Sequence, residues 1–323
     1  MQANPGEFEI IRDYFARAPR GPGVVLGIGD DCALLSAPAE GLLATSVDTL
    51  VEGVHFPRQA PPELIAERAL RVNLSDLAAM NARPLWFTLA LTLPRSDAAW
   101  LQGFAAGLLE TAAEFDISLV GGDTTAGPLS ITVQVTGSAQ QPLRRDGAAP
   151  GDDIFVGGPL GAAAAALPVI LGQRRVSEAE SHQVCDAYYR PAPQLALAAI
   201  VGDLAHSAID ISDGLLADLG HLCRASGVGA ELALETLPVA ELARRLAGEE
   251  ALALAATGGD DYQLCFTLPK ARTEELYRRC AAAGFEPVHI GWVTDRRGDG
   301  EPVRCRLEGR PWHCKQSGYR HFQ

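Results

Sequence analysis

Lysine is almost missing from this 323-residue sequence, where only Lys270 and Lys315 stand among 27 lysine and arginine residues. Neither lysine follows a glycine, so the sequence lacks the Gly-Lys-Ser/Thr core of a Walker P-loop. If the chain handles phosphate groups, then arginines, backbone amides and metal ions must neutralise them.

Positive charge is scarce overall, since the formal net charge is −13. This balance argues against nucleic acid or an anionic membrane as a partner. The sequence also lacks a basic-then-apolar leader and any uninterrupted apolar run of about 18 residues. Its seven cysteines form an odd, scattered set without a C-x-x-C pair. These absences predict a cytoplasmic protein with reduced thiols.

The length favours two domains, because single cores usually stop growing near about 250–300 residues. Helical and strand patterns alternate in both halves, for example a helix over 62–82 and a strand over 86–93. The stretch 144–152 is polar and rich in turn formers. We therefore expect an α/β (or α+β) fold with domains at 1–146 and 147–323.

Short polar signals predict several helix ends. Ser96 is expected to cap a helix, and Ser177 with Glu180 forms a capping box. A third helix is expected to run from Gly214 until Gly227 stops it.

Aspartates follow several apolar or glycine-rich stretches, as though they were gathered at strand ends. The set comprises Asp30, Asp31, Asp48, Asp123, Asp210, Asp213, Asp260 and Asp261. Each alone is explained equally well as a turn or cap residue. Gathered together they would repel one another, so a shared role in binding hard cations such as Mg²⁺ is attractive.

Asp76 lies on the apolar stripe of the helix predicted over 62–82, where a lone carboxylate is costly. An ion pair with Arg71 or Arg83 and a metal ligand are both open explanations. The residue types alone also leave open whether His55, Arg145 and Tyr319 bind anything.

Six segments in order resemble those of the thiamine-monophosphate kinases, within a superfamily that includes aminoimidazole-ribonucleotide synthetase. They span residues 27–33, 46–56, 73–80, 121–125, 210–215 and 258–262. The resemblance implies an N-terminal domain that dimerises through its sheet, a C-terminal α/β domain, and ATP bound between them. It implies direct, in-line transfer of the ATP γ-phosphoryl group to thiamine monophosphate, giving thiamine diphosphate and ADP.

The resemblance also implies roles for individual residues. Several Mg²⁺ ions would be surrounded by Asp31, Ser46, Val47, Asp48, Asp76, Asp123, Asp210 and Asp213. ATP would contact Gly122, Asp123, Arg145 and Ser212, and the thiamine phosphate would contact His55, Asp260 and Tyr319. No catalytic base is assigned, because the acceptor phosphate is already ionised at neutral pH.

Two positions depart from the pattern of the family. Val47 replaces a common threonine and has no hydroxyl, so it would serve a metal only through its carbonyl. Asp260 replaces a common glutamate and has a shorter reach. Two relatives in the superfamily fit poorly: selenophosphate synthetase calls for a reactive cysteine and a lysine near the N-terminus, and the hydrogenase-maturation dehydratase for a C-terminal cysteine. A non-catalytic binding protein is the other alternative, disfavoured by the intact set of acids.

Overall fold

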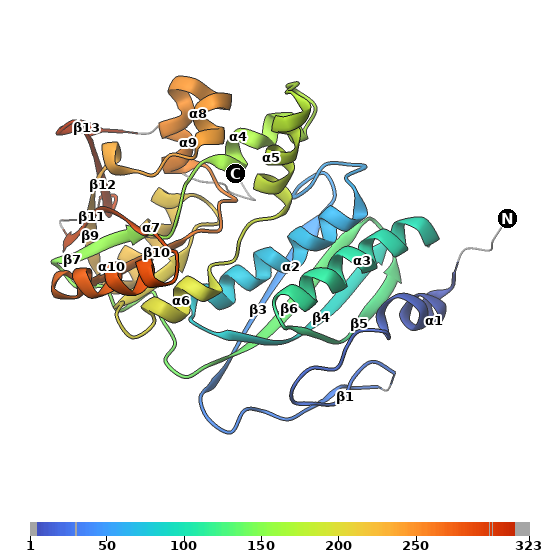
Figure 1. Cartoon of the computed structure of the whole chain (residues 1–323). Coiled ribbons are helices and arrows are strands. Elements are labelled where there is room, and N and C mark those ends of the chain that lie inside the picture. The colour runs from blue at the N-terminus through green and yellow to red at the C-terminus, as the bar shows by residue number, and fades with distance from the viewer. Residues whose placement is uncertain (1–4, 30, 297, 299, 314–323) are drawn as a thin grey trace. The chain divides into compact units, whose positions relative to one another are not determined.

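The computed structural model describes residues 5–29, 31–296, 298 and 300–313 (Figure 1). Two compact units divide the chain. The N-terminal unit comprises Met1–Leu77 and Ala82–Gln140, and the C-terminal unit comprises Ala78–Asn81 and Gln141–Gln323. Within the part of the chain described, no helix is both long and apolar enough to cross a membrane.

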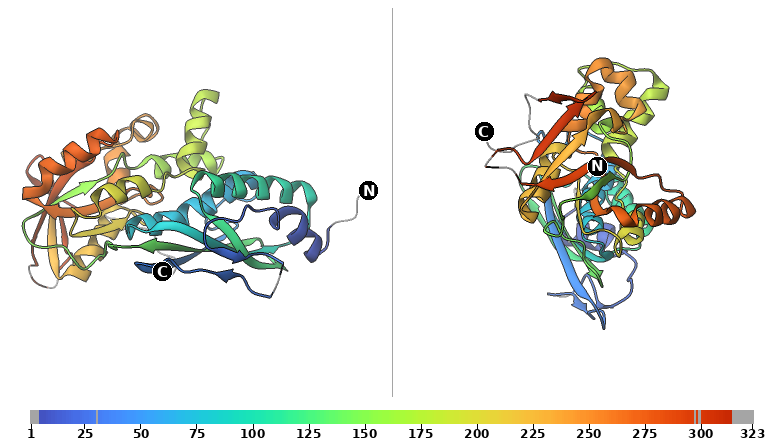
Figure 2. Two further views of the ribbon diagram at one scale, coloured as in Figure 1. Left: turned by 60° about the horizontal axis from the view of Figure 1, so that its bottom comes forward. Right: turned by 90° about the vertical axis from the view of Figure 1, so that its left-hand side faces the viewer.

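A four-stranded sheet forms the base of the N-terminal unit. Its order is β3 (Leu42–Val51), β6 (Ser130–Ala139), β4 (Arg83–Leu93) and β5 (Ser118–Ala126). Only the β4–β5 pair is parallel. Buried and half-buried residues alternate along β6, as expected for a strand with one covered face. Helices α2 (Pro62–Ala79) and α3 (Ala98–Glu114) cover that face (Figure 2).

Shorter elements precede this sheet. They are α1 (Glu7–Ile10), the π-helical turn η1 (Ile11–Phe15), and the hairpin of β1 (Val24–Leu26) with β2 (Leu34–Leu35). The hairpin segment is fixed by Trp86, whose indole N–H donates to the Pro22 carbonyl at 3.0 Å. Val24 and Ala33 pack there against a small buried cluster that includes Trp86 and Val120.

A seven-stranded sheet forms the centre of the C-terminal unit. Its order is β13 (Arg310–Trp312), β12 (Val303–Leu307), β9 (Val228–Ala233), β11 (Val288–Asp295), β7 (Asp152–Val156), β10 (Leu264–Pro269) and β8 (Ser207–Asp210). All neighbours are antiparallel except β12 and β9. Both faces are buried, because Ile154 and Phe155, consecutive in β7, belong to two different apolar clusters.

Helices form the layers on this sheet. They are α4 (Ala162–Ile170), α5 (Glu178–Tyr189), α6 (Leu195–Val201), α7 (Leu215–Ser226), α8 (Glu241–Ala247), α9 (Ala251–Thr257) and α10 (Thr273–Ala282). Single turns η2 (Leu234–Thr236), η3 (Gly248–Glu250) and η4 (Lys270–Arg272) join them. The expected mixed α/β class is confirmed.

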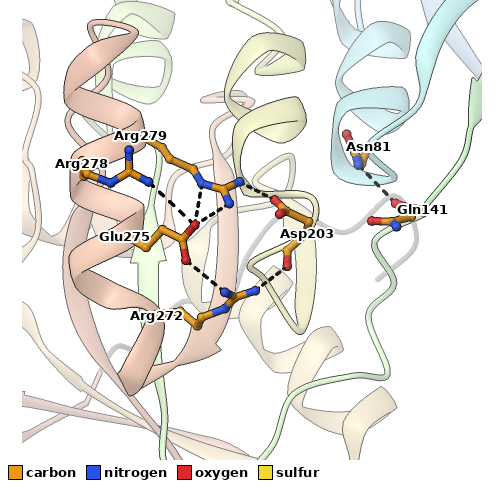
Figure 3. A network of polar contacts seen from close by, with 7 residues as sticks. All are labelled: Asn81, Gln141, Asp203, Arg272, Glu275, Arg278 and Arg279. Atoms are coloured by element: carbon orange, nitrogen blue, oxygen red, sulfur yellow. Dashed lines mark hydrogen bonds and ion pairs between the residues drawn. The ribbon is translucent and has the colours of Figure 1, made fainter.

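Charged side chains connect α10 to the turn that follows α6 (Figure 3). Arg279 bonds to Asp203 at 2.7 Å and to Glu275, and Arg272 bonds to Glu275 at 3.0 Å. Asn81 donates to the Gln141 carbonyl at 3.2 Å, which fixes the end of segment 78–81 within the C-terminal unit. Such exposed pairs contribute little free energy, so they align the helices more than they stabilise the unit.

Two of the three helix-end predictions are confirmed. The Ser177 capping box is present, and Gly227 ends α7 in the left-handed conformation with φ 70°. The Ser96 prediction is wrong. Asp97 is the N-cap of α3, and its carboxylate accepts from Ala99 and Trp100 at 3.0 and 3.2 Å. A carboxylate also complements the positive end of the helix dipole.

Candidate functional site

Aspartates of the predicted set lie at three kinds of position. Asp210 ends β8 as predicted, Asp213 follows it, and Asp31 lies in the turn after β1. Asp48 and Asp123 instead lie inside β3 and β5, and Asp260 and Asp261 follow helix α9. The strand-end prediction is therefore wrong for these four, while Asp30 lies outside the described residues.

The reason lies in where the side chains point. Successive side chains of a strand point to opposite faces of the sheet, and the backbone ladder does not depend on their polarity. Asp48 and Asp123 are exposed, so neither carboxylate has to be buried for its strand to continue. The strands therefore continue beyond Asp48 and Asp123.

Strand β3 and helix α2 bring four polar residues together in the N-terminal unit. The Ser46 hydroxyl donates to the Asp76 carboxylate at 2.5 Å. The Asp48 backbone N–H donates to the Asn73 side-chain oxygen at 3.0 Å, and the Asn73 amide donates back to the Ala69 carbonyl at 2.8 Å. Asn73 is buried and was missed from the sequence as a positioning group. Arg71, one of the two suggested partners of Asp76, pairs with Glu114.

Asp48 and Asp76 are both acidic, so their negative charges repel each other. The pKa of Asp48 is raised to about 6. The larger cause is the loss of hydration near the surrounding protein atoms, even though the residue is exposed, and the smaller cause is the negative charge of Asp76. A nearby cation would relieve that repulsion. Two carboxylates and a hydroxyl are the hard oxygen ligands that Mg²⁺ prefers, so the residues fit this ion.

The Ser46–Asp48–Asp76 cluster by itself supplies only part of a coordination shell. Among the described residues, no group of three or more His, Cys, Asp or Glu side chains is placed to hold a metal ion. Mg²⁺ commonly keeps several waters and takes further oxygens from substrate phosphates. The arrangement therefore suits an ion that arrives with a nucleotide.

Val47 lies on β3 between Ser46 and Asp48 and has no side-chain hydroxyl. The Asp48 N–H donates to Asn73, and the Val51 N–H, four residues after Val47, donates to the His55 ring. Both odd- and even-numbered N–H groups of β3 thus reach partners outside the β6 ladder, so simple strand alternation assigns no direction to the Val47 carbonyl. The role of Val47 as a ligand stays a prediction.

Asp123 is separated from the Ser46–Asp48–Asp76 cluster. Asp123 pairs with Ala90, whereas Asp48 pairs with Val133, which in turn pairs with Leu89. Since Leu89 and Ala90 point to opposite faces, so do Asp48 and Asp123.

The neighbouring Gly122 tolerates no side chain. A Cβ on it would lie 1.8 Å from the Leu89 carbonyl oxygen. Gly122 therefore allows β5 an approach to β4 that any larger residue would prevent.

His55 lies in the turn after β3 and is half-buried. The ring Nδ1 of His55 accepts from the Val51 backbone N–H at 3.0 Å, and the His55 backbone N–H donates to the Val51 carbonyl at 2.9 Å. These bonds fix the imidazole ring on its turn. They hold the ring in one orientation, which a substrate-binding histidine requires.

Two loops of the C-terminal unit are hydrogen-bonded to each other. The Asp260 N–H donates to the Ser212 carbonyl and the Tyr262 N–H to the Ile211 carbonyl, both at 2.8 Å. Asp260 and Tyr262 adopt positive φ angles of 70° and 48°, which are unusual for residues with side chains. The Tyr262 hydroxyl donates to the Asp260 carboxylate at 3.2 Å. The structure thus brings together Ser212 and Asp260, expected to contact ATP and substrate respectively.

Two buried carboxylates support these loops. Sequence reasoning gave Asp218 no role and counted Asp261 only among the possible cation ligands. Asp218 accepts from the N–H groups of residues 212, 213 and 214. Asp261 accepts from the Gly161 N–H at 2.7 Å, at the start of α4. Burial raises the pKa of each to about 7, with Asp210 and Asp213 adding to the effect at Asp218. For Asp218 the available signal was helical spacing, since it lies three residues after Leu215 and four before Leu222 on the buried stripe of α7.

Two further predicted residues are only partly placed. Arg145 is exposed, and its carbonyl accepts from the Ser226 hydroxyl at 2.7 Å. That bond fixes the backbone of the loop where Arg145 lies. Tyr319 lies outside the described residues.

Known families match most of the chain. Residues 29–139 match the N-terminal domain of AIR synthase related protein, and residues 149–303 match its C-terminal domain. Thiamine-monophosphate kinase of Escherichia coli (strain K12) is 44% identical over 98% of this chain and 98% of its own length.

Solved structures agree with the family matches. Thiamine-monophosphate kinase from Stenotrophomonas maltophilia K279a superimposes with a TM-score of 0.83 at 40% identity, covering 93% of this chain and 95% of that one. AaThiL complexed with AMPPCP and TMP gives a TM-score of 0.78 at 31% identity, covering 91% and 92%. The chain therefore belongs to the thiamine-monophosphate kinase family, with its two AIR synthase related domains.

Proposed function

We propose that this protein phosphorylates thiamine monophosphate with ATP, giving thiamine diphosphate and ADP. Relatives named thiamine-monophosphate kinase over the whole length support this, as does the AaThiL complex with AMPPCP and TMP. The observation that carries the proposal is the Ser46–Asp48–Asp76 cluster, which joins two carboxylates and a hydroxyl in a chain that has two lysines.

Metal-assisted, in-line transfer is the proposed mechanism. Mg²⁺ would be held by Asp31, Ser46, Asp48, Asp76, Asp123, Asp210 and Asp213, and by Val47 through its backbone carbonyl. When bound, the ions would neutralise the phosphate oxygens and align them. The ligands Ser46, Asp48 and Asp76 would be held in fixed positions, because they lie on the regular elements β3 and α2. The hydrogen bond from the Asp48 N–H to Asn73 joins these two elements.

Separate groups would hold the two substrates. For ATP they are Gly122, Asp123, Arg145 and Ser212, where Gly122 permits close backbone approach and the Arg145 guanidinium can bind a phosphate with two parallel bonds. His55 and Asp260 would contact the thiamine phosphate, and Tyr319 remains a prediction. No residue needs to remove a proton, because the acceptor phosphate is already ionised.

A homodimer formed through the N-terminal sheet is also proposed. Edge strand β3 exposes Leu42, Leu43 and Val47, the last with 57% of its surface accessible. A long edge with exposed apolar side chains favours pairing with another strand or sheet. Domains at 1–146 and 147–323 and a cytoplasmic location, without nucleic-acid or membrane partners, complete the proposal.

Product analysis tests the activity. Purified protein is incubated with ATP and Mg²⁺ and with either thiamine monophosphate or thiamine, and products are separated by chromatography. Equimolar thiamine diphosphate and ADP are expected with thiamine monophosphate, and neither once EDTA is added. No thiamine diphosphate under saturating ATP and Mg²⁺ would refute the proposal.

A further inference from the structure

Asp218 lies in the first turn of α7 and is 4% exposed. One of its carboxylate oxygens, Oδ2, accepts from three successive backbone N–H groups: Ser212 at 3.0 Å, Asp213 at 3.1 Å and Gly214 at 3.0 Å. A concave run of backbone N–H groups is ordinarily an anion-binding feature. Here the protein fills it with its own carboxylate, so this run of amides belongs to the support of the loop.

The carbonyl side of the same loop is fixed independently. The Ile211 and Ser212 carbonyls accept from Tyr262 and Asp260. Gly214 has φ 124°, and a Cβ on it would lie 2.6 Å from the Thr257 carbonyl oxygen. The backbone of residues 211–214 is therefore held on one side by a buried carboxylate and on the other by the loop that bears Asp260.

Asp213 and Ser212 are the side chains that this backbone displays, and both are half-buried. Their direction depends on the three N–H groups, because a change in any of these peptide planes rotates the adjacent Cα–Cβ bonds. A buried carboxylate is itself costly unless hydrogen-bonded, so Asp218 and the loop hold each other in place.

We infer that Asp218 is a positioning residue: without contacting ATP itself, it holds residues 212–214 so that Asp213 and Ser212 meet the metal-bound nucleotide. The inference rests on the proposed function, which assigns Asp213 to Mg²⁺ and Ser212 to ATP. It adds Asp218, a residue that does not touch the nucleotide but that should influence nucleotide binding by keeping the loop of residues 212–214 ordered.

The test compares Asp218→Asn with Asp152→Asn. Asp152 is an equally buried aspartate of the same unit, and it accepts from the Ala149 N–H and pairs with His206 at 2.9 Å. Asparagine keeps the size of the side chain but replaces an acceptor oxygen with a donor. Both variants lose hydrogen bonds to a buried carboxylate. An effect seen only in Asp218→Asn therefore comes from the loop of residues 212–214 and not from the general loss of a buried bond.

Hydrogen exchange and calorimetry give readouts that need no turnover. In metal-free protein, amides 212–214 should exchange on the order of tenfold faster in Asp218→Asn, and at the wild-type rate in Asp152→Asn. The Kd for Mg²⁺–ATP, from titration calorimetry, should rise on the order of tenfold in Asp218→Asn only. The KM for thiamine monophosphate should change less than the KM for ATP.

Unchanged exchange and unchanged Mg²⁺–ATP affinity in folded Asp218→Asn would overturn the inference. Should that variant fail to fold, Gly214→Ala disturbs the same loop while Asp218 stays intact, and it should weaken Mg²⁺–ATP binding. Wild-type affinity in folded Gly214→Ala would equally overturn the inference. A wild-type protein that makes no thiamine diphosphate refutes the proposed function instead, and the exchange comparison remains decisive for Asp218.

Discussion

The two units place their acidic residues in different ways. In the N-terminal unit, Ser46 and Asp48 stand on strand β3 and Asp76 on helix α2. Ser46 donates directly to Asp76, and the charge of Asp76 helps to raise the pKa of Asp48. In the C-terminal unit, Asp213 and Asp260 stand on loops whose backbone is fastened to other groups, including the buried carboxylate of Asp218.

This difference separates two physical problems. The N-terminal cluster is built on regular elements, and its cost is repulsion between carboxylates, which a cation or a proton relieves. The positions of the C-terminal loops depend on hydrogen bonds made behind them, from the buried Asp218 and from the facing loop. Changes in the first region should therefore affect metal-dependent rates and pH response, and changes in the second should affect stability and binding.

The largest expected effect is on catalysis in Asp48→Asn. Loss of one carboxylate from the proposed Mg²⁺ site should lower kcat/KM by on the order of 10²–10³, because Mg²⁺ would then be held less well to neutralise the negative charge on the phosphoryl group being transferred. A steady-state coupled assay that follows ADP release measures kcat/KM. Asp97→Asn makes the same change at the α3 N-cap, where asparagine caps equally well, and should retain full activity. Equal rates in the two variants would exclude Asp48 from the site.

Asp261→Asn should mainly reduce stability. The Gly161 N–H and the start of α4 lose a charged acceptor, so the free energy of unfolding should fall by about 1–3 kcal/mol in denaturant titrations. The KM for thiamine monophosphate should rise severalfold because Asp260 is its neighbour.

Ser177→Ala provides the matched control, since it removes the N-cap acceptor of α5. It should cost about 1 kcal/mol without changing that KM. An unaltered KM in Asp261→Asn would show that the loop position does not depend on this bond.

A pH dependence follows from Asp48 in metal-free protein. Its folded-state pKa of about 6 lies above the ordinary 3.8, so the folded state binds the proton more tightly than the unfolded state does. The contribution of Asp48 to stability is therefore present at low pH and is lost as pH rises from about 4 to about 6. Asp48→Asn should gain stability relative to wild type at pH 7 compared with pH 4, measured by unfolding in EDTA. A difference that is the same at both values would contradict the shifted pKa.

The smallest expected effect is in Val47→Ala. Alanine keeps the backbone carbonyl, the one group through which Val47 could serve a metal, so the half-saturating Mg²⁺ concentration should stay within about twofold of wild type. Ser46→Ala, one residue away, removes the hydroxyl that donates to Asp76 and should raise the half-saturating Mg²⁺ concentration further. A Val47→Ala effect as large as that of Ser46→Ala would show that the valine side chain itself shapes the metal site.

Much of the fold was predictable from local signals. The capping box at Ser177 and the glycine stop at Gly227 act within one turn of chain, so residue types decide them. The limits of β3 and β5 were not predictable in this way, because a strand continues through an aspartate whose side chain stays exposed, and that exposure is set by how the sheet packs. Sheet order is a long-range property.

The same limit applies to the candidate site. Motif residues such as Asp48, Asp76 and Asp213 could be named from the sequence, since resemblance transfers position by position. The roles of Asn73, Asp218 and Asp261 could not, because each depends on backbone N–H groups whose place is set by folding. The separation of Asp123 from Asp48 is likewise set by strand register.

The central claim is direct, Mg²⁺-dependent transfer between ATP and thiamine monophosphate. A single-turnover reaction with [γ-³²P]ATP and excess enzyme tests it most directly. The account predicts that the label moves from ATP to thiamine diphosphate without appearing on the protein, and that EDTA stops it. Label retained on the protein, released only as inorganic phosphate, or transferred equally well in EDTA would contradict it.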